Sequence, residues 1–222
     1  VLVVGGGGRE HAICWKLAQS PKVTELYCAP GNAGIAQVAR CIDIKATDID
    51  GMVAWARDNA IGLVMVAPDD PLALGMVDVL EAAGIPAFGP RANAAVIEAS
   101  KAFSKELMAK HHIPTAKYKT FTDINAALSY IDAQGAPIVV KADGLALGKG
   151  VVVAATVDEA KAAVREMMAD KKFGASGSTV VIEECMTGPE ITVLAFSDGK
   201  HIVPMPASQD HKRAFDGNRG PN

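Results

Sequence analysis

The chain has 222 residues, half of them hydrophobic, and its formal net charge is −3 at pH 7. This balance excludes the strong positive field with which proteins attract nucleic acid or an anionic membrane surface. No apolar run approaches the ~20 residues of a membrane-spanning helix. We therefore expect a soluble globular protein of one or two domains, with neither nucleic acid nor a membrane as a partner.

Strands and helices alternate over the first hundred residues, because short runs rich in valine and isoleucine are separated by segments with helical periodicity. Such alternation is typical of βαβ units and predicts a Rossmann-like α/β domain with a parallel sheet. The predicted strands are residues 1–4, 23–29, 41–44, 63–67 and 86–88. The predicted helices are residues 11–19, a segment capped by Asp48 or Asp50 and ending near residue 59, and residues 71–83.

The pattern changes after about residue 100. Two apolar strands, 137–141 and 150–155, flank a short glycine-rich loop, and so short a connection predicts an antiparallel pair. We therefore predict an α+β second part, with a boundary near residues 98–121. Its other predicted elements are helices at 101–111, 123–132 and 156–169 and extended segments at 117–121, 179–184 and 190–197.

The last nineteen residues, from Pro204 to Asn222, are polar and glycine-rich and lack periodicity. No predicted helix or strand closes the second part there, so we expect it to be incomplete. The four cysteines are scattered without a Cys-x-x-Cys pair, which predicts small buried hydrophobes in a reducing cytoplasm and no disulfide framework. The five histidines show no metal-ligand spacing either.

The first motif is a run of glycines at residues 5–8 that separates a strand from a helix and is followed by Arg9. A helix N-terminus presents free N–H groups to an anion, and a guanidinium suits phosphate. The segment does not match the dinucleotide-binding pattern Gly-x-Gly-x-x-Gly, because Glu10 stands where the third glycine is required. The second predicted strand also ends in Ala29-Pro30, where an acidic residue should bind the ribose. We favour a small phosphorylated ligand here; a tight structural turn and a dinucleotide are the alternatives.

The second motif, KADGLALGKGV, begins at Lys141. It differs from a Walker P-loop, because three residues separate Gly144 from Gly148, Gly150 follows Lys149, and strands flank it on both sides. A glycine loop with one lysine at its base and another at its tip suits a lid over nucleotide phosphates. The alternative is a surface hairpin with a solvated lysine.

The third motif is a strand that ends at Glu183, Glu184 and Cys185. A strand that runs into a non-helical hinge offers backbone groups to the edge of a purine, and an acid beyond it, such as Glu190, can accept ribose hydroxyls. Taken alone, Glu183 and Glu184 are more often solvated charges at a strand end. Their position after the glycine loop is what favours a nucleotide.

The fourth motif, SQDHKR, begins at Ser208 in a segment without periodicity. A solvated loop is the default interpretation. The functional one is a substrate-contacting loop with Lys212 and Arg213 near anionic groups. A hydrolase triad of Ser208, Asp210 and His211 is disfavoured, because the serine lies in no Gly-x-Ser-x-Gly elbow and sequence neighbours in a loop rarely converge in this way.

Taken in order, these motifs resemble the phosphoribosylamine–glycine ligase family, ATP-grasp enzymes of purine synthesis. The resemblance covers essentially the whole chain but only about the first half of such an enzyme. It rests on the segments GGREHA, APGNAG, SKAF, IPTA, VVKADGLALGKGV, VIEE and QDHKR. It implies a Rossmann-like domain at 1–99, a connecting segment at 100–121, an ATP-grasp lid subdomain at 122–188 and a truncated second subdomain at 189–222.

The resemblance implies that ATP activates glycine as glycyl phosphate, which the amine of 5-phosphoribosylamine attacks to give glycinamide ribonucleotide, ADP and phosphate. Lys141 and Lys149 would neutralise the phosphates, with no covalent nucleophile. Magnesium ligands are expected beyond residue 222, and we expect the 222 residues alone to bind nucleotide weakly and to lack ligase activity. Another ATP-grasp ligase or carboxylase of purine synthesis, or a NAD-dependent oxidoreductase, is the alternative.

The resemblance also implies roles for single residues in the two halves of the site. Those expected to bind ATP are Lys105, Lys141, Gly144, Gly148, Lys149, Gly150, Glu183, Glu184, Cys185 and Glu190. Those expected on the phosphoribosylamine side are Gly7, Gly8, Arg9, Asn32, Pro71, Leu72, Asp210, His211 and Lys212. No metal ligand is expected among them.

Overall fold

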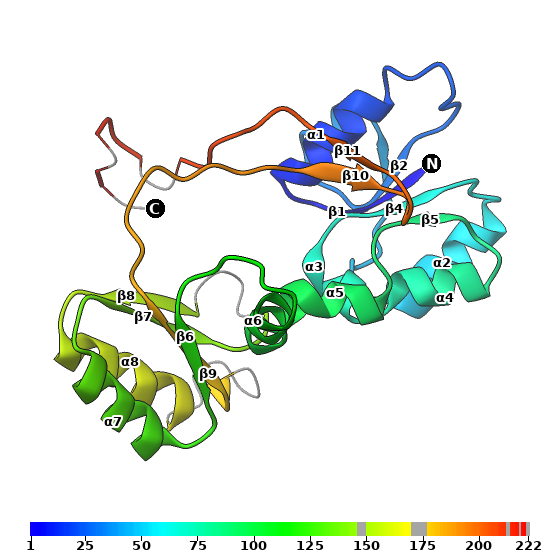
Figure 1. The fold of residues 1–222 in the computed structure, drawn as a ribbon. Coiled ribbons are helices and arrows are strands. Elements are labelled where there is room, and N and C mark those ends of the chain that lie inside the picture. The colour runs from blue at the N-terminus through cyan, green and yellow to red at the C-terminus, as the bar shows by residue number, and fades with distance from the viewer. Residues whose placement is uncertain (146–149, 170–176, 212–213, 218, 221–222) are drawn as a thin grey trace. The chain divides into compact units, whose positions relative to one another are not determined.

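The computed structural model describes residues 1–145, 150–169, 177–211, 214–217 and 219–220. The chain forms two compact units, Val1–Cys185 and Met186–Asn222 (Figure 1). The first unit contains a parallel and an antiparallel sheet, each with its own covering helices. Our finer division at residues 99, 121 and 188 stays a prediction. No described helix is long and apolar enough to cross a membrane.

The parallel sheet has five strands in the order β3-β2-β1-β4-β5, which confirms the predicted α/β architecture. Its strands are β1 (Leu2–Gly5), β2 (Tyr27–Pro30), β3 (Arg40–Cys41), β4 (Val64–Val66) and β5 (Ala87–Phe88). The strand order runs in opposite directions on the two sides of β1. In open α/β sheets the crevice beyond the carboxyl ends of the strands at such a switch point is where ligands bind.

Both faces of β1 are covered, because its residues alternate between two buried clusters. Leu2 and Val4 pack in one cluster with α2 (Ile49–Asp58) and α4 (Met76–Ala82). Val3 packs in the other with Cys14 of α1 (Gly8–Leu17), Cys28 and the 3-10 turn η1 (Ile35–Gln37). The expected burial of cysteines holds for this pair, whereas Cys41 and Cys185 are half-buried.

Several boundaries in this sheet differ from the prediction. The helix predicted over 71–83 is two helices, α3 (Asp69–Ala73) and α4, because Gly75 adopts a left-handed conformation with φ of 84°. Helix α5 (Ala92–Ala99) was not predicted, and α1 begins at Gly8 instead of residue 11. The second and third strands are shorter than expected. The side chain of Asp48 caps α2 by accepting the Gly51 N–H, as predicted.

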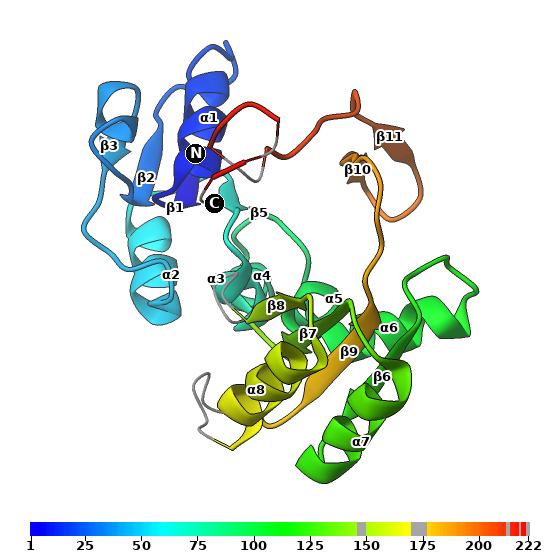
Figure 2. The ribbon, with the colours of Figure 1, turned by 90° about the vertical axis from the view of Figure 1, so that its left-hand side faces the viewer.

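The antiparallel sheet has four strands in the order β6-β9-β7-β8, which confirms the predicted α+β second part. Helices α7 and α8 lie side by side on one of its faces (Figure 2). The strands flanking the glycine loop, β7 and β8, pair antiparallel as expected. The elements are α6 (Lys101–Lys110), β6 (Tyr118–Phe121), α7 (Ile124–Gln134), β7 (Ile138–Ala142), β8 (Val151–Ala154), α8 (Val157–Met168) and β9 (Val180–Glu184).

The second unit is built on a two-stranded antiparallel hairpin, β10 (Ala195–Ser197) and β11 (Ile202–Pro204). The strand predicted at 190–197 is thus confined to its last three residues, and β11 was not predicted. An isolated bridge between Thr192 and Ser208 extends the pairing. The apolar side chains of the hairpin are exposed, Ile202 by 73% and Phe196 by 55%.

Candidate functional site

Strand pairing brings Lys141 and Glu183 to the same face of the antiparallel sheet. Alternate residues of β7, such as Val140 and Ala142, enter the core beneath α7 and α8, so Lys141 points to the opposite face. In β9 the core takes Val180 and Ile182, which leaves Glu183 on that opposite face as well. Lys141 pairs with Val181, and Glu183, two residues further along, is its diagonal neighbour.

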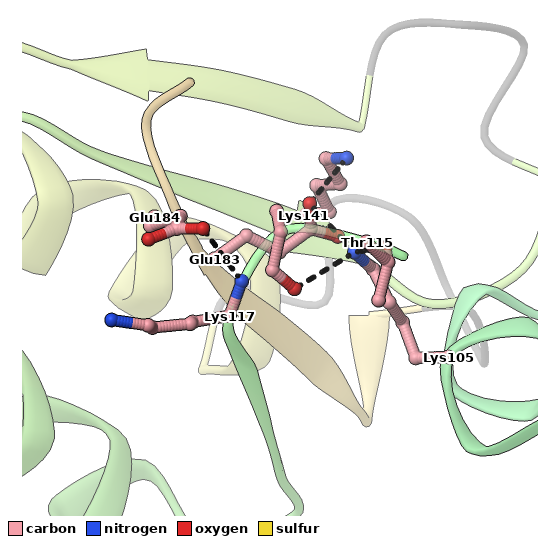
Figure 3. Close-up of polar contacts among 7 residues, drawn as sticks. Lys105, Thr115, Lys117, Lys141, Glu183 and Glu184 are labelled. Carbon is pink, nitrogen blue, oxygen red and sulfur yellow. Dashed lines mark hydrogen bonds and ion pairs between the residues drawn. The ribbon is translucent and has the colours of Figure 1, made fainter. Parts of the chain in front are cut away.

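One carboxylate oxygen of Glu183 binds two lysines (Figure 3). Its Oε2 accepts a hydrogen bond of 2.9 Å from Lys141 Nζ and lies 3.2 Å from Lys105 Nζ, which reaches it from α6. The side chains of Lys105 and Glu183 are 8% and 6% exposed, and that of Lys141 is 27% exposed. The structure thus brings together three of the residues predicted to bind ATP.

Lys105 is enclosed by protein acceptors. Its Nζ donates to Thr115 Oγ1 at 2.7 Å and approaches the carbonyl oxygen of Ala116 at 3.5 Å, and it lies 5.4 Å from the centre of the Tyr118 ring. With Glu183 these partners occupy the three N–H groups of an ammonium. Thr115 and Ala116 were not predicted as site residues, although both belong to the IPTA segment.

The second carboxylate oxygen of Glu183, Oε1, is buried and has no hydrogen-bond partner among the described residues. A buried polar atom without a partner is uncommon in proteins. The common reading of Glu183 as a solvated charge is therefore wrong, since the register of β9 turns it inward. Glu184 is exposed as expected, and its Oε1 accepts the Lys117 N–H at 3.0 Å.

The structure describes the two ends of the glycine loop, at Gly144 and Gly150, whereas residues 146–149 lie outside the described part. Gly144 accepts a hydrogen bond of 2.8 Å from Lys101 Nζ, and the carbonyl oxygen of Gly150 accepts the Ala142 N–H at 2.8 Å. The expected ATP residues Gly148 and Lys149 lie outside the described residues, as does Lys212 from the expected phosphoribosylamine site.

The first glycine loop is held by its own neighbours. Gly7 N–H donates to Glu10 Oε2 at 2.6 Å, and Arg9 Nη1 donates to the carbonyl oxygen of Ala67 at 3.0 Å. Arg9 also lies 3.6 Å from Asp69 Oδ1. Space beside Gly8 is open, because a Cβ atom there would meet nothing within 4 Å. The loop therefore keeps room for a ligand at Gly8 and the exposed part of Arg9.

Three other residues expected on the phosphoribosylamine side make structural contacts within the first sheet and its loops. Asn32 donates to the carbonyl oxygen of Gly6 at 2.9 Å and accepts the Ile35 N–H at 2.9 Å. Pro71 and Leu72 are buried in α3. These contacts support the loops around the first sheet and leave Pro71 and Leu72 little surface for a ligand.

A cavity of about 500 Å³ within Val1–Cys185 joins the two glycine loops. Gly7, Gly8 and Arg9 line it together with Gly144 and Gly150. It lies beyond the carboxyl ends of β1 and β4, where the switch in strand order favours a ligand site. Further lining residues that the sequence analysis did not assign as site residues include Glu10, Asp69, Asp70, Glu98 and Lys101.

The unit Met186–Asn222 has a hollow of its own, of about 610 Å³. Glu190, expected at the ribose, lines it together with Asp210 and His211, which were expected on the phosphoribosylamine side. This hollow therefore brings together a residue expected to bind ATP and two residues expected to bind phosphoribosylamine. Phe215 forms part of the same wall.

Comparison with known families gives two adjoining matches that together span the chain. Residues 1–98 match the N domain of phosphoribosylglycinamide synthetase, and residues 99–222 match its ATP-grasp (A) domain. The phosphoribosylamine–glycine ligases of Xanthomonas axonopodis pv. citri and Vibrio cholerae are 54% and 52% identical, over 100% of this chain and 52% of each relative. The chain thus spans about half the length of the curated relatives it matches.

Solved structures agree in fold. The phosphoribosylamine–glycine ligase of Thermotoga maritima superposes with a TM-score of 0.82 at 28% identity, over 100% of this chain and 52% of that one. The biotin carboxylase domain of a Hydrogenobacter thermophilus 2-oxoglutarate carboxylase, solved with MgADP and bicarbonate, gives 0.76 at 15% identity over 96% of this chain and 50% of that one. So low an identity shows a shared fold and no more.

Proposed function

This chain belongs to the phosphoribosylglycinamide synthetase family, and from that premise we propose that it takes part in the ATP-dependent ligation of glycine to 5-phosphoribosylamine. A glycine carboxylate oxygen attacks the γ-phosphorus of ATP, and ADP leaves, which gives glycyl phosphate. The amine of phosphoribosylamine then attacks the carbonyl carbon and loses a proton as phosphate departs. The products are glycinamide ribonucleotide, ADP and phosphate, and no bond to the protein forms.

The observation that carries the nucleotide site is the cluster around Glu183. Two ammonium groups and one carboxylate leave an excess of one positive charge in a largely buried place, which favours the binding of an anion. The triphosphate of a nucleotide supplies the negative charge that this excess attracts.

Within this cluster we assign different parts to the two lysines. Lys141, the more exposed, meets the phosphates first, and Gly144 and Gly150, which line the 500 Å³ cavity, offer backbone groups to them. Lys105 reaches a phosphate only after leaving Thr115 and Ala116. Gly148 and Lys149 complete the phosphate contacts, and Glu184, the Cys185 backbone and Glu190 complete those to adenosine.

On the phosphoribosylamine side we propose that Gly8 and Arg9 face the phosphate of the substrate in the 500 Å³ cavity. Gly7, Asn32, Pro71 and Leu72 shape the loops behind it. We further propose that Asp210, His211 and Lys212 contact phosphoribosylamine. We also propose a cytoplasmic location, with ATP, glycine and phosphoribosylamine as the partners.

Magnesium accompanies ADP in the Hydrogenobacter structure. In the described part of this chain, however, no group of three or more His, Cys, Asp or Glu side chains is arranged to hold a metal ion. Magnesium is usually held by one or two carboxylates together with the phosphates of the nucleotide. We assign no metal ligand here and derive no step through the ion.

The proposal is tested by nucleotide binding to Lys141→Ala and Lys117→Ala in a polypeptide of the length of the curated relatives that contains this chain. Lys117 neighbours the cluster but its ammonium points away from Glu183 (Figure 3), so it is a matched control. We expect Lys141→Ala to weaken ATP affinity by about tenfold or more and Lys117→Ala by less than about twofold, measured by calorimetric titration. Stabilisation of the wild type by NAD and not by ATP would contradict the proposal.

Turnover is tested in a polypeptide of the length of the curated relatives that contains this chain. ADP release should require both glycine and phosphoribosylamine, and Lys141→Ala should reduce it. Unchanged release in Lys141→Ala would remove this lysine from its role. ADP release with bicarbonate in place of glycine would favour a carboxylase instead.

A further inference from the structure

A second polar cluster ties the start of α6 to the end of β7. The Asp143 carboxylate accepts hydrogen bonds from Ser100 Oγ, at 3.2 and 3.1 Å to its two oxygens, and from the Ala102 N–H at 3.0 Å. The next residue, Gly144, accepts from Lys101 Nζ at 2.8 Å through its carbonyl oxygen. Contacts across more than forty residues of sequence therefore join the base of the glycine loop to the helix that carries Lys105.

These contacts exceed what an ordinary helix cap requires. Ser100 already caps α6, because its Oγ accepts the Phe103 N–H at 3.1 Å. Asp143 adds a second acceptor from outside the helix, and Lys101 engages the residue that follows it. Asp143 is itself fixed to the sheet, since its N–H donates to the carbonyl oxygen of Thr179 at 2.9 Å.

The position of this cluster couples it to the nucleotide lysines. Lys141 lies two residues before Asp143, and Lys105 lies four residues after Lys101 on α6, one turn along the same helix face. The contacts to Glu183 thus link α6 and β7 through β9, and the contacts to Asp143 link α6 to the residues that directly follow β7. Burial lowers the pKa of Lys101, which Asp143 opposes, so this ammonium is partly withdrawn from water.

We propose that Ser100, Lys101 and Asp143 are positioning residues that hold Lys141 and Gly144 in place for the phosphates of the nucleotide. The part concerning nucleotide rests on the proposed function, whereas the part concerning Lys141 does not. The competing explanation is a local cap that stabilises α6 and leaves Lys141 where it is.

The comparison of Asp143→Ala with Asp123→Ala separates the two explanations. Asp123 caps α7 by accepting the Ala126 N–H at 2.7 Å, so both variants remove a capping carboxylate but only Asp143→Ala breaks a link between α6 and β7. The readout is the rate at which an amine-acylating reagent labels Lys141 in the ligand-free chain, followed by peptide mass spectrometry. We expect about fivefold faster labelling in Asp143→Ala and no change in Asp123→Ala. Equal rates in the two variants would overturn the proposal.

Two further variants distinguish a local displacement of Lys141 from a general loss of folding. Asp143→Asn keeps an oxygen for the Ala102 N–H and should label within about twofold of the wild type. Lys101→Met keeps the helix cap, removes the bond to Gly144 and should speed labelling of Lys141 as well. If Lys101→Met and Asp143→Ala both leave Lys141 protected, the cluster does not position it.

The second experiment measures nucleotide binding in a polypeptide of the length of the curated relatives that contains this chain. Asp143→Ala should bind ATP about tenfold more weakly than Asp123→Ala at a temperature where both are folded. Equal affinities would refute the role toward phosphates. Failure of the wild type itself to bind ATP would count against the proposed function, while the labelling rates would still decide whether Asp143 positions Lys141.

Discussion

Glu183 is the residue on which the charge balance of the nucleotide site depends. Its carboxylate is the acid in contact with both Lys105 and Lys141. Lys141, which is 27% exposed, can turn toward water, but Lys105 is 8% exposed and remains enclosed. A buried cation that loses its carboxylate keeps the cost of leaving water without the compensating attraction.

Replacement of Glu183 by glutamine should therefore be strongly destabilising. We expect Glu183→Gln to lower the free energy of unfolding by about 3 kcal/mol, because the Lys105 ammonium is left enclosed without a counter-charge. Urea denaturation followed by circular dichroism measures this change. The matched control is Glu184→Gln, whose exposed amide can still accept the Lys117 N–H and which should cost less than about 1 kcal/mol. Equal losses in the two variants would show that the cluster does not depend on the charge of Glu183.

The neighbouring acids also show what the sequence can and cannot predict about single residues. Both were expected at the adenine, but consecutive residues of a strand point to opposite faces. Only the register that sets Val181 opposite Lys141 shows that Glu183 is the enclosed acid. Asp143 was not assigned any role, because its partners lie some forty residues away and leave no local pattern.

At the scale of elements, the turn of the β10–β11 hairpin depends on one carboxylate. Asp198 Oδ2 lies 2.9 Å from His201 Nδ1, and its Oδ1 accepts the backbone N–H groups of His201 and Lys200. The His201 side chain and these N–H groups lower the pKa of Asp198 to about 2 from an ordinary value of 3.8. A depressed carboxyl pKa stabilises the fold above the unfolded pKa and loses this effect as the pH falls through the folded value.

Asp198 should accordingly remain mostly ionised at pH 3, where an ordinary aspartate is mostly protonated. The hairpin turn should keep its hydrogen bonds down to about pH 3 and lose them as the pH falls through about 2. The carboxyl carbon shift of Asp198, followed by NMR against pH, measures this directly. A titration midpoint near pH 4 for the Asp198 carboxyl group would contradict its hydrogen bonds to Lys200 and His201.

The elements that the sequence analysis missed lacked local signals. The pattern over 71–83 continues through Gly75, and a single glycine is tolerated within a helix, so only its φ of 84° reveals the break. Helix α5 begins after Arg91, which makes no side-chain cap. By contrast, α2 and α7 carry capping aspartates and were found close to their true starts.

At the scale of the whole molecule, the described residues that are buried all lie in one of the two units. The three hydrophobic clusters draw all their members from Val1–Cys185. In the described part of Met186–Asn222 no residue is buried, and side chains such as Met186 and Ile202 are more than two-thirds exposed. Burial of apolar surface is the main source of folding free energy, so the first unit should be stable by itself.

Truncation after Cys185 tests this directly. We expect the free energy of unfolding to change by no more than about 1 kcal/mol, because none of the described residues that are removed has a buried apolar side chain. Truncation after Met168 is the informative contrast, since it deletes β9, which lies between β6 and β7 in the sheet. That variant should lose the cooperative unfolding of the antiparallel sheet in urea, with Val180 and Ile182 taken from its core. Equal destabilisation by the two truncations would mean that the first unit depends on residues 186–222 for its stability.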